Sequence, residues 1–481
     1  MAPEHEMMAA TTAAGAAPPA GREPAACLPA CLLERLIGRP AETWTVEDLS
    51  ELAVARGVRL VSLMHVGGDG WLKALDFVPQ SRHHLSDVLT GGERADGSSL
   101  FQGLGVQVGA SDILLRPRLS TAFLDPFATL PTLVVLSGHA GRDGAPLPQS
   151  PDTILRRADE RLARETGVRL RALGEVEYFL GRRAGEEDVY GADDRGYHAT
   201  SPFVFGEGLR REAMATLAEI GVPVKYGHSE VGYVQARETD GTIWEQHEIE
   251  LGLAPLPHAA DAVVLTQWVL RNLAHRRGMR CSFDPILRRG HAGTGLHFHF
   301  SPVVDGAHCG GRAPDGTLSP PAQWLIAGLV QMGGALMAFG NRTEGSLIRL
   351  TQAKEAPNSI VWGEFDRSAL VRLPIVANDA EGRPVSPPTI EFRLPDGSAH
   401  PHLLLAGVAQ AMVLGRRTED IGRLLDRTWV VNVRAGKGAP VPVPTRFPEV
   451  ADALAAHRAA LEAGGVFPAV LLEQVIERLN A

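Results

Sequence analysis

The segment 170-LRALGEVEYFL-180 combines an apolar strand pattern with two acidic residues, Glu175 and Glu177. Side chains two positions apart on a strand point to the same face, so these carboxylates lie about 7 Å apart on one surface. Two anions at that separation suit a bound cation, but they also suit a solvated strand face. The segment therefore predicts a strand and leaves a metal site as one of two interpretations.

A second strand pattern, 294-TGLHFHFSPV-303, places His297 and His299 on one face by the same spacing. The glycines that precede it allow a backbone to approach a ligand closely. Imidazole together with carboxylate suits manganese or magnesium sites of mixed nitrogen and oxygen character. Taken alone, such a pair is more often an ordinary strand surface.

Further charged residues lie at strand ends and in loops. Glu230 occurs in 225-KYGHSEVG-232 and Glu248 in 243-IWEQHEIEL-251, and neither position is specific by itself. Arginines that point into one pocket would bind a carboxylate through two guanidinium nitrogens each and would neutralise a transferring phosphoryl group. The alternative is that these arginines form ordinary ion pairs on the surface. The candidate arginines are Arg349, Arg367, Arg372 and Arg393.

Three common nucleotide and metal motifs are missing from the sequence. It contains no GxxxxGK[ST], no GxGxxG after a strand pattern and no HExxH. A P-loop, a Rossmann dinucleotide site and a zincin site therefore have no support.

Alternating helix and strand patterns flank the two opening segments and predict an α+β fold. Expected strands are 132–140 and 222–231, and expected helices are 151–167, 209–221, 259–278, 320–340, 450–465 and 471–481. The helix over 320–340 is apolar nearly all round, which favours a buried core helix over a membrane span.

The N-terminal part predicts a small sheet-rich domain. Short helices are expected at 31–40 and 45–57, two strands at 58–66 and 71–79 around a Gly-Gly-Asp-Gly turn, and a loop at 89–105. Residues 1–30 are rich in alanine and proline and are expected to form a disordered extension. The predicted division is 1–30, then 31–130, then a large mixed catalytic domain over 131–481.

Bulk composition excludes several classes of protein. The 481 residues carry a formal net charge of −9, which argues against a nucleic-acid partner because phosphate backbones require a basic face. Four cysteines, Cys27, Cys31, Cys281 and Cys309, are too few and too scattered for a disulfide framework. With no recognisable secretory signal, we expect a soluble cytoplasmic protein without a membrane partner.

The order of the short segments is more specific than any one of them. DGSS, GEVEYF, HSEV, QHEIE, GTGLHFH, EAP, RSALVR and EFRLPDGSAHP follow one another in the chain. In this order the sequence resembles the class I-like glutamine synthetases over roughly residues 45 to 430. The resemblance implies a β-grasp N-terminal domain, a catalytic domain with a curved antiparallel sheet, and an ATP-dependent ligase.

The resemblance also implies roles for particular residues. One Mg²⁺ or Mn²⁺ ion would be held by Glu177, Glu230 and Glu248, and a second by Glu175, His297 and Glu391. His299 and Ser301 would meet ATP, Arg349, Arg393 and Gly293 would hold the amino acid, and Arg367 and Arg372 would stabilise the phosphoryl group. Asp96, Ser99, Tyr197 and Glu230 would receive ammonium, with Asp96 taking its proton, and Glu355 would close the site.

The chain departs from the family pattern near the amino-acid site. Ala292 stands where an asparagine is expected, Asp366 replaces the asparagine before Arg367, and the flap reads LTQAKEAP. About ten residues are inserted between HSEV and QHEIE, so Glu238 competes with Glu248 for the role of metal ligand. We prefer Glu248 because QHEIE keeps the family spacing from the following helix.

Three functions are compatible with this resemblance. The first is a glutamine synthetase that joins ammonia to glutamate through γ-glutamyl phosphate. The second is a γ-glutamylamide synthetase that uses a primary amine, such as a polyamine, an alkylamine or a biosynthetic amine. The third is a non-catalytic assembly, against which the retained metal-ligand and arginine positions argue. The resemblance further implies a dodecamer of two hexameric rings, in which Asp96 reaches the site of the neighbouring subunit.

Overall fold

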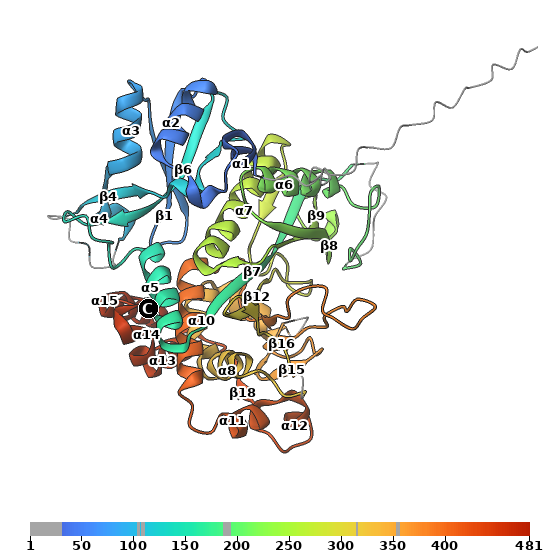
Figure 1. Ribbon diagram of the computed structural model, residues 1–481. Helices are drawn as coiled ribbons and strands as arrows, with labels where there is room; N and C mark the ends of the chain where they lie inside the picture. Colours follow the sequence, from blue (N-terminus) through green and yellow to red (C-terminus); the bar gives the residue numbers. More distant parts are fainter. Residues whose placement is uncertain (1–30, 103–105, 107–110, 186–193, 314–315, 353–355) are drawn as a thin grey trace, which may run out of the picture.

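A computed structural model describes residues 31–102, 106, 111–185, 194–313, 316–352 and 356–481. The predicted extension over 1–30 therefore lies outside the described residues. Figure 1 shows two connected parts, an N-terminal sheet and a larger mixed part, residues 141–481, which is called the catalytic part because the resemblance implies that role. This arrangement of helices and sheets confirms the predicted α+β class.

Among its described residues, the first part contains four α-helices and a mixed sheet. Its helices are α1 (Leu32–Ile37), α2 (Val46–Ala55), α3 (Arg82–Gly91) and α4 (Gly97–Leu100). Its strands are β1 (Leu60–Val66), β2 (Leu72–Phe77), β3 (Glu93–Asp96), β4 (Asp112–Pro117), β5 (Phe123–Leu124) and β6 (Thr132–Ala140). The strand order is β2-β1-β6-β4-β3, with β5 on β6 and a parallel β1–β6 pair.

Alternate residues of β1 and β6 pack into two different cores. Leu63 and Val135 pack with α2 and α3, whereas Met64 and Val134 belong to the large core of the catalytic part. Side chains alternate between the two faces of a strand, so this sheet is buried on both sides.

The expected boundary at residue 130 is too early. β6 follows that boundary and is a central strand of the first sheet, paired with both β1 and β4. The buried, mostly apolar sequence of β6 would suit a strand of either domain. Only its pairing with β1 and β4 assigns it to the first sheet. The name β-grasp for this part stays a prediction.

The expected loop at 89–105 is partly wrong. Within it, β3 pairs antiparallel with β4, and Asp96 accepts a hydrogen bond from the backbone N–H of Ser98 at the start of α4. The preceding helix α3, capped by Ser81, was not expected. Ser81 and Asp96 serve as N-caps here, and β3, which contains neither glycine nor serine, is formed by its pairing with β4.

The catalytic part is built on a long curved sheet. Its order is β15-β16-β17-β12-β7-β9-β8, antiparallel except for β15–β16. The strands are β7 (Arg169–Arg183), β8 (Val224–Val234), β9 (Thr242–Leu251), β10 (Ala254–Pro255), β11 (Arg280–Ser282), β12 (Leu296–Val304), β13 (Ala307–His308), β14 (Ser359–Ile360), β15 (Trp362–Glu364), β16 (Val371–Leu373), β17 (Ile390–Phe392) and β18 (Val441–Pro442). The two opening segments of the sequence analysis are β7 and β12, neighbours at the centre of this sheet.

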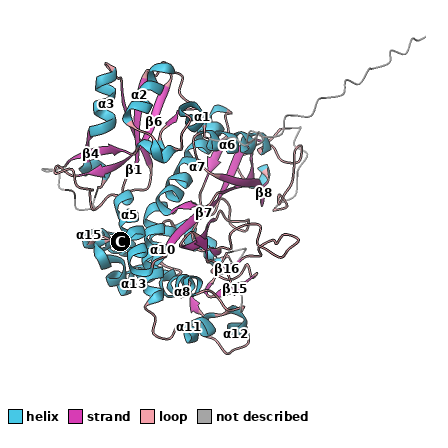
Figure 2. Ribbon diagram, in the orientation of Figure 1, coloured by secondary structure: helices cyan, strands magenta, loops and turns pink. Residues whose placement is uncertain are grey.

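Helices pack against this sheet and against one another, as Figure 2 shows. They are α5 (Pro151–Thr166), α6 (Glu207–Glu219), α7 (Leu256–Arg276), α8 (Pro320–Gly340), α9 (Glu344–Thr351), α10 (Pro401–Arg416), α11 (Ile421–Thr428), α12 (Val430–Arg434), α13 (Phe447–Ala456), α14 (Arg458–Glu462) and α15 (Ala469–Asn480). The single helix expected over 450–465 is divided into α13 and α14 at His457.

Among the described residues, α8 is the helix that is long and apolar enough to cross a bilayer. In the structure, 83% of its most apolar window is buried, and it packs against α10 and α13. This confirms the prediction of a core helix.

Candidate active site

A cavity of about 560 Å³ lies on one face of the catalytic sheet. Most predicted site residues line it: Glu175, Glu177, Tyr197, Glu230, Glu248, Gly293, His297, His299, Arg349, Arg367, Arg372, Glu391 and Arg393. The strand register explains the gathering, because Glu175 lies opposite His297, Glu177 opposite Glu248, and His299 opposite Glu391. Same-face positions on adjacent strands bring together residues that are distant in sequence.

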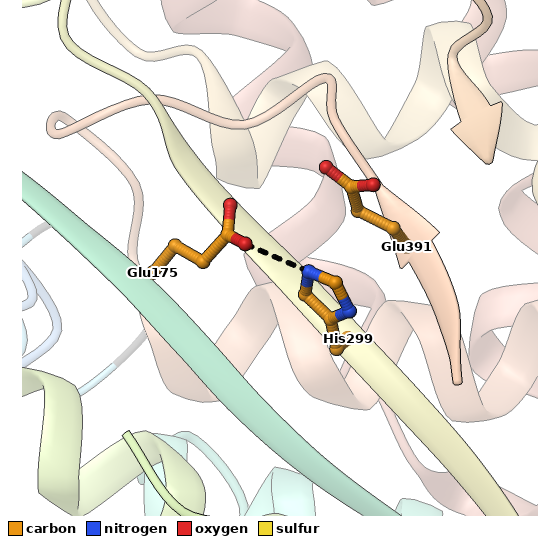
Figure 3. A group of neighbouring side chains, drawn as sticks. All are labelled: Glu175, His299 and Glu391. Carbon is orange, nitrogen blue, oxygen red and sulfur yellow. Dashed lines mark hydrogen bonds and ion pairs between the residues drawn. The ribbon is translucent and has the colours of Figure 1, made fainter. Parts of the chain in front are cut away.

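The first group of possible metal ligands contains Glu175, His299 and Glu391 (Figure 3). Glu175 Oε1 lies 2.9 Å from His299 Nε2, and its Oε2 lies 2.9 Å from His297 Nδ1. His297 Nδ1 is also 3.8 Å from Glu391 Oε1. Both histidines thus face the same pair of carboxylates, whereas the resemblance implied only His297 as a ligand.

The second group contains Glu230 and Glu248, as expected, together with His228. Their ligand atoms all lie within 4.8 Å of one another. Since β8 and β9 are paired, His228 lies directly opposite Glu248.

Glu177, the third expected member of this group, is held by neutral donors. Its Oε2 accepts hydrogen bonds from Gln246 Nε2 at 2.8 Å and from the backbone N–H of Gly295 at 2.7 Å. Gln246 Nε2 also donates to the carbonyl of Gly293 at 2.9 Å. These bonds orient the carboxylate beside both groups.

The arginines lie beside the first group of possible ligands. Arg393 donates to Glu391 Oε1 at 2.6 Å, and Arg372 donates to the other oxygen of the same carboxylate. Arg349, at the C-terminal end of α9, donates to the carbonyl of Leu394 at 3.1 Å. Buried guanidinium groups in these positions can bind anions with two nitrogens each.

The electrostatics of the cavity favour a bound cation. Burial raises the pKa of Glu248 well above its usual range, and the surrounding carboxylates of Glu175, Glu177 and Glu230 add to this shift. By contrast, His299 keeps the pKa of Glu175 well below its usual range despite burial. So many acidic oxygens, with imidazole nitrogens among them, fit magnesium or manganese by donor chemistry.

Some expected residues are not in this cavity. Asp96 ends β3 of the first sheet and Ser99 lies in α4, where its Oγ donates to Asp96 Oδ2 at 2.6 Å. Ser301 is fully buried behind the lining and hydrogen-bonds to His308 Nδ1 at 2.8 Å. Glu355 lies outside the described residues. Glu238, the competitor of Glu248, is in a short helical turn after β8 and does not line the cavity.

Other lining residues were not predicted from the sequence. His228 and Glu230 are two apart in HSEV, the same spacing that singled out His297 and His299, so the signal was available. Glu250, opposite Glu175, forms an ion pair with Lys225 at 2.7 Å. Its position on the cavity face follows from its spacing to Glu248.

The family model for the glutamine synthetase catalytic domain matches residues 148–477. The chain belongs to the glutamine synthetase family. The matched range begins just before α5 and contains the whole curved sheet and its cavity. The glutamine synthetases of this family are ATP-dependent ligases, and this chain carries their catalytic domain.

Curated relatives and a solved structure agree with this family. The chain is 29% identical to a glutamine synthetase of Azospirillum brasilense over 422 residues, which is 81% of this chain and 86% of the relative. It is 28% identical over 466 residues to the 3-hydroxylaminophenol mutase of Cupriavidus pinatubonensis, covering 90% and 94% of the two chains. The Plasmodium falciparum glutamine synthetase structure has a TM-score of 0.77 and 19% identity, covering 91% of this chain and 96% of that one.

Proposed function

We propose that this glutamine synthetase family member joins ammonia to the side-chain carboxylate of glutamate, using ATP to form γ-glutamyl phosphate first. The observation that supports this proposal is the presence of two chemistries in one cavity. Carboxylates and imidazoles from the sheet line the cavity together with guanidinium groups, which lie directly beside them. Phosphoryl transfer to a carboxylate brings several negative charges together, so cations and fixed arginines stabilise its transition state.

The individual roles that we propose are those implied by the family resemblance. Arg349 and Arg393, with the backbone at Gly293, would hold the amino acid, and Arg367 and Arg372 would bind the transferring phosphoryl group. His299 would contact ATP, whereas the buried Ser301 would act only through His308, to which it is hydrogen-bonded. Mg²⁺ or Mn²⁺ held by the two ligand groups would supply positive charge to the phosphates. ATP use and the scattered cysteines support a cytoplasmic location.

We propose that Asp96 and Ser99 act in the cavity of a neighbouring subunit. Members of this family form oligomers, and a dodecamer of two hexameric rings is our proposal for this chain. Hydrogen bonds from the hydroxyls of Ser99, Ser98 and Ser111 hold the pKa of Asp96 well below its usual range. In the subunit alone this carboxylate stays ionised, which suits attraction of ammonium better than acceptance of its proton.

A primary amine is the alternative acceptor, and an aromatic cluster beside Glu230 favours it. The ring of Tyr197 stacks on His198 with centroids 4.3 Å apart and is 48% exposed. His198 in turn lies 4.6 Å from the ring of His228. Aromatic faces next to carboxylates attract organic ammonium groups through cation–π contacts.

The test is an assay of the purified protein with ATP, Mg²⁺ or Mn²⁺ and glutamate, supplied with ammonium or one of a panel of primary amines. Phosphate release is followed together with mass spectrometry of the amide. Glutamine as the fastest product supports ammonia, and Asp96→Ala should then reduce its formation strongly.

Two other results would change the proposal. A γ-glutamylamide formed selectively from one amine, with ammonium a poor substrate, would replace ammonia by that amine. Absence of metal-dependent turnover with every pairing would contradict both ligase proposals and favour a non-catalytic assembly.

A further inference from the structure

His228 lies in the cavity between two acidic residues, on the edge strand β8. Its Nε2 is 3.2 Å from Glu248 Oε1, and its Nδ1 is 3.8 Å from Glu230 Oε1. Its side chain is only 16% exposed. The family resemblance gave this residue no role.

The hydrogen bond on the other side of the ring fixes where the proton lies. His228 Nδ1 is 3.0 Å from the carbonyl oxygen of Ser229. A carbonyl oxygen can only accept, so Nδ1 carries hydrogen in this bond. In the neutral ring, Nε2 then presents its lone pair toward Glu248.

The lone pair of Nε2 and an ionised Glu248 Oε1 repel each other at 3.2 Å unless a proton or a metal ion lies between them. A divalent ion about 2.1 Å from each ligand atom brings neighbouring ligand atoms to about 3 Å, which matches the separation of Nε2 and Oε1. Metal-binding histidines usually donate their other ring N–H to a carbonyl or carboxylate, as Nδ1 does here.

Aromatic neighbours hold the ring in this orientation. His228 lies edge-on to Tyr197 at 5.5 Å and stacks on Tyr226 at 6.0 Å between centroids. Both tyrosines line the same cavity. Fixing a ligand ring by packing lowers the ordering cost of metal binding.

We propose that His228 is a direct ligand, through Nε2, of the divalent ion held with Glu230 and Glu248. This inference rests on the metal dependence of the proposed function. A nitrogen ligand changes which ion the site prefers. Mg²⁺ strongly favours oxygen, whereas Mn²⁺ accepts imidazole, so His228 biases this site toward Mn²⁺.

Binding of Mn²⁺ alone tests the proposal without turnover. Free Mn²⁺ is counted by its electron paramagnetic resonance signal during titration of the metal-free protein, and Mg²⁺ affinity is obtained by competition. The variants are His228→Ala, which removes the ligand, and His228→Gln, which offers an amide oxygen. The matched control is His83→Gln, a histidine on α3 that is 89% exposed.

In His228→Ala we expect one class of Mn²⁺ sites to weaken about tenfold or more, with the other class unchanged. In His228→Gln we expect the Mn²⁺-to-Mg²⁺ preference of that class to fall, because an oxygen replaces the nitrogen. The control should match the wild type. The melting temperatures of the metal-free wild type and variants are compared to separate a lost metal ligand from lost folding. If His228→Ala is unfolded, the Mn²⁺ affinity of His228→Gln tests the proposal instead.

Unchanged or tighter Mn²⁺ binding in both variants would overturn the proposal. Tighter binding would mean that His228 is an imidazolium ion that competes with the metal. Failure of the ligase assay together with weakened Mn²⁺ binding would refute the proposed reaction and leave this inference standing. A working ligase whose His228 variants bind Mn²⁺ as the wild type does would support the proposed reaction and refute this inference.

Discussion

Arg349 reaches the cavity from the end of α9 and is 4% exposed. Its NH1 group donates to the carbonyl of Leu394, and its other terminal nitrogen lies 3.4 Å from His297 Nε2. The planar fork therefore has a fixed orientation before any substrate binds. Fixed orientation lowers the ordering cost of binding a carboxylate.

At this residue we predict that Arg349→Lys raises KM for glutamate about tenfold or more and leaves KM for ATP within about twofold. A lysine keeps the charge but loses the planar pair of donors. Steady-state kinetics with each substrate varied in turn measure both constants. An unchanged KM for glutamate would remove Arg349 from the amino-acid site and weaken the proposed function itself.

Sequence spacing predicted the cavity side chains on β7 and β12 but not their pairing partners. The i, i+2 rule places Glu175 and Glu177 on one face, yet only the register shows that Glu175 lies between His297 and Glu250. Register depends on contacts between distant segments, which a local pattern does not contain.

At the scale of the element, Asp396 anchors α9 to the turn after β17. Its carboxylate accepts hydrogen bonds from Asn341 Nδ2 at 2.8 Å and from Ser398 Oγ at 2.6 Å. Ser398 Oγ is also 3.2 Å from Ser346 Oγ, three residues before Arg349 in α9. The fully buried Asp396 thus connects the helix to the end of the sheet.

We predict that Asp396→Ala lowers the free energy of unfolding by about 2–4 kcal/mol and raises KM for glutamate, because it leaves buried donors unsatisfied and frees α9. Denaturant unfolding and steady-state kinetics measure the two effects. Asp87→Asn on α3, an exposed position, is the control. A variant as stable as wild type would show that α9 is held by other contacts.

Between the two parts of the molecule, β1 and β6 carry a buried histidine pair. His139 Nε2 is 3.1 Å from His65 Nδ1. Burial lowers the pKa of His139 to about 3 and of His65 to about 4. The charged or titratable neighbours are Arg118, Asp152 and His402 around His139, Lys73 and Asp69 around His65, and Asp261, which binds Arg118.

Both histidines are neutral in the folded protein, whereas unfolded histidine takes up a proton below about pH 6.5. Their contribution to the free energy of unfolding is therefore fully present above pH 6.5 and is lost as the pH falls toward 4. We predict that the melting temperature decreases over this range and that His139→Gln makes the decrease shallower. Scanning calorimetry from pH 8 to 4.5, with His83→Gln as control, checks this; equal slopes in all three proteins would contradict it.

Most long elements could be predicted because their apolar periodicity is unambiguous. The ends predicted for α8 and β6 are those observed, and β7 extends its prediction by one residue at the start and three at the end. The errors are concentrated at α3, β3 and α4, where Ser81 and Asp96 cap the helices and β3 is formed by pairing with a strand that follows later in the chain. The cavity volume and the orientation of His228 depend on tertiary packing, which the sequence pattern does not contain.

At the scale of the whole molecule, the position of Asp96 leads to an assembly prediction. Asp96→Ala and Glu248→Ala should each abolish glutamine formation as separate proteins. Co-expressed in one oligomer, they should recover activity, because about a quarter of sites in a random mixture would combine an intact Asp96 with an intact Glu248.

The measurement is the specific activity of doubly tagged, tandem-purified mixed oligomers. Oligomers that carry both substitutions in every chain are the control and should stay inactive. Inactive mixed oligomers would show that each subunit supplies its own Asp96 or that the residue has another role.

The sheet formed by β1 and β6 lies between two cores, with alternate side chains packed into each. Neither part of the chain is then a self-sufficient module, although the family match covers only one of them. A fragment that begins at residue 148 would expose the apolar surface of α5 and α7 that the sheet normally covers. Grafting the N-terminal part of a relative onto this chain would require matching the inward residues of both strands. The two parts are therefore expected to evolve together. Exchange of the N-terminal part between relatives should succeed only when the residues of the other part that contact β1 and β6 are exchanged with it.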